Sequence, residues 1–118
     1  MLFDPSKIKN VYVACGYTDM RKQIDGLAAI VELQYKREFD AESIFLFCGK
    51  KPDRIKALCW DGSGYVLLYK RLAGQRFQWP RNEKELKMIT PQEFRWLMEG
   101  LSITQKKVIR DTAPAKMF

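Results

Sequence analysis

The stretch from residue 50 to residue 81 carries the side chains with the most distinctive chemistry. It holds eight of the 21 Lys and Arg residues, opposed only by Asp53 and Asp61, so nearly all of the net charge of +7 lies there. Aromatic residues alternate with these cations. The positive charge would attract a polyanion, and the aromatic rings between the cations could stack on its bases. This combination predicts a nucleic acid as partner. A solubilising sheet face over an aromatic core fits the composition about equally well.

Strand alternation within this stretch decides which side chains share a face. It places Lys56, Tyr69, Arg71, Arg76 and Gln78 together, beside a loop with Lys50, Lys51 and Arg54. Cations on a twisted sheet can meet successive phosphates, and a tyrosine between them can stack a base. The candidate nucleic-acid-binding residues are therefore Lys50, Lys51, Arg54, Lys56, Tyr69, Lys70, Arg71, Arg76 and Arg81. Large aromatic residues such as Trp60, Phe77 and Trp79 are expected in the core instead.

A catalytic interpretation has less support in the sequence. The chain has no histidine, no phosphate-binding G-x-x-x-x-G-K loop and only three cysteines, which are far apart and expected to be buried thiols. Asp19, Asp53 and Asp61 would have to converge in space to build a metal-dependent nuclease, and helix capping or turn formation explains each of them. We therefore predict a protein without enzymatic activity, metal or cofactor.

The secondary structure that positions these residues can be read from the apolar pattern. Residues 8–14 predict a strand, and Thr18 is expected to cap a helix of about 18 residues. Residues 43–48 form a continuous apolar run, typical of a strand that is buried on both faces. Residues 55–60 and 65–71 flank a turn at 61–64, and residues 76–79 predict a third strand that Pro80 ends. The middle third is thus expected to be an antiparallel meander.

The C-terminal part contains the strongest local signal. Thr90, Pro91 and Glu93 have the spacing of a capping box, and Gly100 suits the end of the helix that follows. The predicted order is β-α-β-β-β-β-α in a single α+β domain over residues 1–105, followed by a basic, flexible tail over residues 106–118. The longest apolar run, residues 44–48, is too short to cross a bilayer, and no secretion signal precedes it. A cytoplasmic protein without a membrane partner or small-molecule substrate is expected.

Three ordered blocks of the sequence resemble a known family. The segments 11–27, 53–72 and 76–80, which read VYVACGYTDMRKQIDGL, DRIKALCWDGSGYVLLYKRL and RFQWP, are similar to the signature of TnpB-type accessory proteins. These are the products of the second open reading frame of the insertion-sequence-sixty-six transposons. They are distinct from the longer RNA-guided nucleases that share the TnpB name.

This resemblance implies an accessory protein required for DNA transposition, acting beside a separate transposase that carries out strand chemistry. It supplies no catalytic residues. The leading hypothesis is a non-catalytic factor that binds DNA through the basic, aromatic-rich sheet face and loop. The alternatives are a protein-interaction module that docks onto the transposase or another element-encoded subunit and, less favoured, a metal-dependent nuclease.

Overall fold

The continuous apolar run of the sequence forms the central strand of the sheet. All six residues of β2 (Ser43–Cys48) are buried in the computed structural model, which describes residues 2–81 and 84–103. β2 pairs in parallel with β1 (Asn10–Ala14) and antiparallel with β3 (Arg54–Trp60). β4 (Tyr65–Arg71) and β5 (Leu86–Ile89) form the two edges, which gives the strand order β4-β3-β2-β1-β5.

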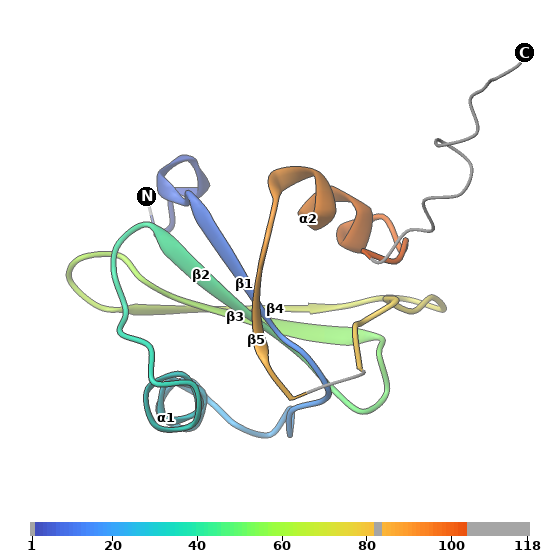
Figure 1. Ribbon diagram of the computed structural model, residues 1–118, viewed down its shortest axis with the longest axis horizontal. Helices are drawn as coiled ribbons and strands as arrows, with labels where there is room; N and C mark the ends of the chain where they lie inside the picture. Colours follow the sequence, from blue (N-terminus) through green and yellow to red (C-terminus); the bar gives the residue numbers. More distant parts are fainter. Residues whose placement is uncertain (1, 82–83, 104–118) are drawn as a thin grey trace, which may run out of the picture.

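Each face of this sheet is covered by one helical layer (Figure 1). On one face, α1 (Ile24–Ala29) continues into a π-helical turn, η2 (Ile30–Gln34), and packs Leu27 and Val31 against Phe45 and Phe47. On the opposite face, α2 (Pro91–Met98) packs Leu97 into a second core. The short 3-10 helix η1 (Pro5–Lys7) precedes β1. The predicted α+β class and the order β-α-β-β-β-β-α are confirmed.

Three local predictions are also confirmed. The Thr90 side chain accepts a hydrogen bond from Glu93 N–H, and the Glu93 carboxylate accepts one from Thr90 N–H, so the capping box is complete. Gly100 follows α2 with a φ of 85°, a left-handed conformation that favours glycine. Asp61 closes the β3–β4 turn by accepting bonds from Ser63 N–H and Gly64 N–H.

The predicted start of the first helix is wrong. α1 begins at Ile24, six residues after Thr18, and its N-cap residue Gln23 makes no side-chain cap hydrogen bond. Asp19 instead accepts hydrogen bonds from the backbone N–H and the guanidinium of Arg21. These local bonds hold residues 17–22 as a loop, because they satisfy the backbone in a non-helical conformation.

The position of the fourth strand is also wrong. Residues 76–79 do not pair with β4, so the observed meander is β2-β3-β4, and the remaining strand is β5, which pairs with β1. Phe77 and Trp79 are buried as expected, 2% and 6% exposed. Individual hydrogen bonds, and not a strand ladder, hold their segment in place. Phe77 N–H donates to Pro52 O at 2.7 Å, and Trp79 Nε1 donates to Ala14 O at 2.9 Å.

Arg81 joins two loops at one end of the sheet. Its Nη1 donates to Gly16 O at 3.1 Å, and its Nη2 donates to Gly49 O at 2.7 Å and to Lys50 O at 3.3 Å. Carbonyl oxygens of the loops that follow β1 and β2 therefore share one guanidinium. This cation, predicted to contact nucleic acid, is engaged in holding the fold.

The three cysteines are buried and unbridged, as the sequence predicts. Burial raises the pKa of the Cys48 thiol to about 11, so it is protonated at neutral pH. Within residues 2–81 and 84–103, none of the helices has the length and apolar character needed to span a bilayer. The predicted tail, residues 106–118, lies outside the described residues.

Replacing Thr90 by Ala should lower the free energy of unfolding by about 1 kcal/mol, because the Glu93 N–H loses its acceptor. Urea denaturation followed by circular dichroism measures this change. Thr18→Ala is the matched control, and it should leave the midpoint almost unchanged because Thr18 caps no helix. Equal losses in both variants would contradict the observed position of the first helix.

Replacing Arg81 by Ala should cost about 1.5–3 kcal/mol of stability, the usual range for hydrogen bonds from a charged donor. Arg81→Lys should recover only part of this loss, since one ammonium cannot reproduce the two-nitrogen geometry. Arg76→Ala removes an exposed arginine from the same region and serves as the control in the same denaturation series. A stable Arg81→Ala variant would show that the loops do not depend on this guanidinium.

Candidate nucleic-acid interface

Most of the predicted cations gather where β2 ends, β3 begins and β4 ends. Lys50 and Lys51 lie in the loop between β2 and β3. Across the β3–β4 pair, Arg54 lies opposite Arg71, and Lys56 lies opposite Tyr69. The predicted sharing of one face by Lys56, Tyr69 and Arg71 is thus consistent with the observed register.

A third segment, residues 17–22, reaches the same place and is not among the predicted contacts. Thr18 N–H donates to Cys48 O at 2.8 Å, which brings residues 17–22 alongside the loop after β2. Lys50 Nζ lies 6.0 Å from the centre of the Tyr17 ring. Arg21 and Lys22 follow in the same loop. The signal in the sequence is the basic pair Arg21 and Lys22, which a helix starting at Thr18 would have placed in its first turns and which the structure places in the loop before α1.

We call this surface the basic end. Its members lie on the loop at residues 17–22, on the β2–β3 loop with the start of β3, and at the end of β4. It comprises Tyr17, Arg21, Lys22, Lys50, Lys51, Arg54, Lys56, Tyr69 and Arg71.

Two carboxylates offset part of this charge. Asp53, whose side chain is 12% exposed, lies 2.9 Å from Arg54 Nε and 3.7 Å from Lys51 Nζ. The hydrogen bond from Arg54 holds the pKa of Asp53 below its ordinary value, so Asp53 is ionised at neutral pH. Asp19 pairs with Arg21 at 2.7 Å. In the described part of the chain, Lys22, Lys50 and Arg71 have no salt-bridge partner.

Lys56 belongs to the basic end, but it is buried and stabilises the surface residues around it. Its side chain is buried, and its Nζ donates to Lys22 O at 2.8 Å and lies 5.6 Å from the centre of the Tyr69 ring. A buried ammonium needs such partners to offset its desolvation. The Lys56 ammonium therefore fixes the 17–22 loop and the Tyr69 ring, and it is not placed to meet a ligand directly.

Two further predicted contacts do not join this surface. Lys70 alternates with Tyr69 and Arg71 along β4 and lines a groove on the α2 face. Arg76 is exposed, but its segment is not a strand, so it does not share the predicted face with Lys56. The next residues run toward α2, where Gln78 Nε2 donates to Gly100 O at 2.9 Å.

The carboxylates considered for a nuclease have local partners instead. Asp19 and Asp53 pair with the cations described above, and Asp61 accepts bonds within its own turn. Among the residues that the structure describes, no group of three or more His, Cys, Asp or Glu side chains is arranged to hold a metal ion. The geometry thus gives the nuclease alternative no support.

Comparison with known proteins shows which family this chain resembles. The model of the IS66 Orf2-like proteins, TnpB_IS66, matches residues 9–108. The uncharacterized protein y4jC of Sinorhizobium fredii is 32% identical over 106 residues, covering 90% of this chain and 91% of the relative. The uncharacterized protein y4hO of the same organism is 34% identical over 91 residues, covering 77% and 79%. No solved structure matches the chain.

The family match covers most of the chain and includes all three sequence blocks that carry the resemblance. It also includes the segments 17–22, 50–56 and 69–71, which build the basic end. Such coverage confirms the resemblance found in the sequence. The chain belongs to the family of IS66 Orf2-like proteins, which is associated with an accessory function in transposition.

Proposed function

We propose that this accessory protein binds DNA through the basic end, as a non-catalytic component of the transposition complex. The observation that carries the proposal is the convergence of cations from three separate segments on one surface. Lys22, Lys50 and Arg71 come from positions far apart in the sequence, and hydrogen bonds to Cys48 and Lys22 bring their segments together. A concentrated field of one sign attracts a polyanion and accelerates its association.

Exposed tyrosines accompany the cations. Tyr17 and Tyr69 are each 54% exposed, although aromatic side chains usually bury most of their surface. Lysine ammonium groups lie against both rings, 6.0 Å from Tyr17 and 5.6 Å from Tyr69. Rings held in this way can stack on an unpaired base while the neighbouring cations contact the backbone. Distorted or single-stranded DNA at a transposon end would offer both features.

The contacts expected at the basic end are to phosphates. Its exposed cations lie on loops and at the end of a strand, so no helix is needed to enter a groove of the duplex. Phosphate contacts position a protein on DNA and carry no sequence information directly. Binding should therefore be electrostatic and only weakly selective for sequence, and recognition of the element ends would come from another component.

The alternative of docking through the aromatic meander is less supported. Trp60 and Tyr65 pack edge-to-face at 5.1 Å, and Tyr65 packs in the same way against Phe39 at 5.1 Å. These rings therefore contact one another and cover α1-side core residues such as Phe45. Association with a transposase fits an accessory protein, but Trp60 and Tyr65 are largely covered by these contacts, and the exposed Tyr69 of the meander belongs to the basic end.

Removing one phosphate-contacting cation should flatten the salt dependence of DNA binding. For Lys50→Ala and for Arg71→Ala, the slope of log K against log salt concentration should fall by about one unit each. Fluorescence anisotropy with a labelled short duplex, and with the corresponding single strand, measures the slope. Lys70→Ala is the matched control on the opposite face. If all three variants kept the wild-type slope, the basic end would not be the DNA surface.

Replacing Asp53 by Asn should strengthen DNA binding at low salt and make its slope steeper. The substitution preserves the shape of the side chain and removes the negative charge that Arg54 and Lys51 share. Both cations then become available to phosphates. The same anisotropy titration tests this, with circular dichroism to verify folding. A folded Asp53→Asn variant with weaker binding would contradict the proposed role of these cations.

A further inference from the structure

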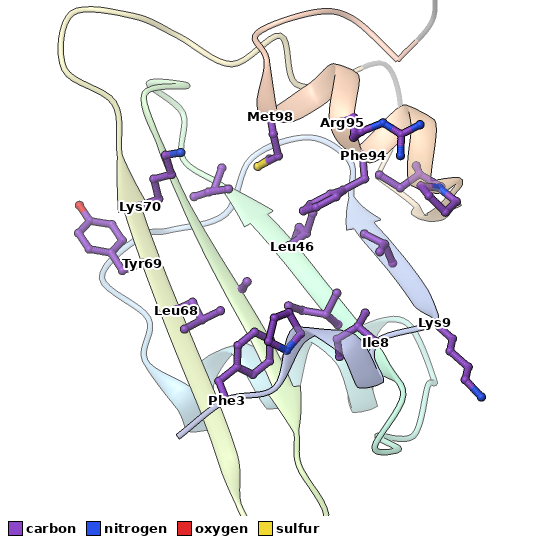
Figure 2. Close-up of a pocket in the computed structure, with 17 residues that line it drawn as sticks. Phe3, Ile8, Lys9, Leu46, Leu68, Tyr69, Lys70, Phe94, Arg95 and Met98 are labelled. Atoms are coloured by element: carbon purple, nitrogen blue, oxygen red, sulfur yellow. The ribbon is translucent and has the colours of Figure 1, made fainter. Parts of the chain in front are cut away.

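An open apolar groove of about 440 Å³ lies on the α2 face of the sheet (Figure 2). Phe94 and Met98 of α2 form one wall, and Phe3 and Ile8, which flank η1, form the other. Leu46 and Leu68 contribute to the floor. In the described part of the chain, α2 has eight residues and covers only part of this face, which leaves the groove beside it.

The groove is larger than incidental packing defects, which rarely exceed the volume of a water molecule. Its volume falls in the range typical of sites that hold a ligand or anchoring side chains. Leu68 belongs to the apolar floor of the groove, and 38% of its surface is exposed to solvent. Covering such a surface removes apolar area from water and is favourable. The fold therefore offers a place where further apolar side chains can be buried.

The charged side chains that line the groove, among the described residues, are all cationic. Lys9, Lys70 and Arg95 are among the lining residues, and no Asp or Glu is among them. Lys9 pairs with Glu42 at 3.1 Å. Lys70 and Arg95 form no salt bridge with any residue that the structure describes. An occupant with carboxylates beside its apolar side chains would therefore complement the groove in both shape and charge.

We propose that this groove docks a segment of a partner protein that has apolar side chains on one side and carboxylates flanking them. Peptide segments of this kind bind apolar grooves through a few buried anchors and bordering ion pairs. Residues 104–118 of the chain carry Lys106, Lys107, Arg110 and Lys116 against a single Asp111, a charge opposite to that of the proposed occupant.

Docking at this groove is compatible with DNA binding at the basic end. Lys70 and Arg71 are neighbours on β4, yet alternation directs them to opposite faces of the sheet. Tyr69 of the basic end also borders the groove, whereas Arg71, Lys50 and Tyr17 do not line it and would stay accessible beside a partner segment. One small domain could thus connect DNA to a second protein, and the two interactions can be tested separately.

Selection from a displayed library of random peptides tests the proposal, with the folded full-length chain as target. Enriched peptides should combine Leu, Ile or Phe at regular spacing with an excess of Asp and Glu. Synthetic copies, followed by fluorescence anisotropy, should bind about tenfold more weakly to the Lys70→Glu/Arg95→Glu variant. Leu68→Gln, at a partly exposed position where folding is expected to be retained, should also weaken them. Arg71→Glu should leave peptide affinity unchanged while it weakens DNA binding.

Several results would overturn the groove proposal. These are the absence of enriched peptides, enrichment of basic or uncharged peptides, and equal binding to the double charge-reversal variant. In a nuclear magnetic resonance titration, signals of groove residues that shift with dodecanoate but with no peptide would assign the groove to a small amphiphile instead. Sedimentation showing a dimer that Leu68→Gln dissociates would assign it to a second copy of the chain. Loss of DNA binding in Arg71→Glu with peptide binding intact separates this proposal from the DNA proposal.

Discussion

The burial of β2 on both faces is the constraint on which the rest of the structure depends. A strand with six buried residues needs a covering layer on each side, because every second side chain points to each face. The parallel pairing of β1 with β2 requires a crossover, and α1 within it covers one face. Among the described residues, the opposite face is covered by α2, the N-terminal segment and the buried loop with Phe77 and Trp79. The two faces therefore differ, one closed by a helix and one with an open groove.

The same arrangement separates two kinds of cation. At the end of the sheet, loops from three parts of the chain meet, and internal acceptors decide which cations stay available. Arg81 and Lys56 are bound to backbone carbonyls, and Asp53 offsets Arg54. Lys22, Lys50 and Arg71 have no salt-bridge partner among the described residues, and these are the cations that we propose to contact phosphates. On the α2 face, cations border an apolar groove, where carboxylates with adjacent apolar groups are the complementary chemistry.

Local signals in the sequence predicted local structure well. The capping box at Thr90 and the doubly buried run at residues 43–48 were both found where expected, because neighbouring residues determine them. The helix start predicted at Thr18 was wrong, because Asp19 accepts hydrogen bonds from Arg21 that hold this segment as a loop. The strand expected at residues 76–79 was replaced by residues 86–89, since pairing with β1 is a contact between distant parts of the chain. The role of Arg81 was missed for the same reason: its acceptors lie more than 30 residues away.

We propose that the basic end, and not the groove, contacts DNA. A nuclear magnetic resonance titration of the backbone amides with a short duplex at low salt tests it most directly. The account predicts shifts that gather at residues 17–22, 49–54 and 69–71, while amides of α2 and η1 remain unchanged. Shifts centred on the α2 face, or no shifts with either duplex or single strand, would contradict it.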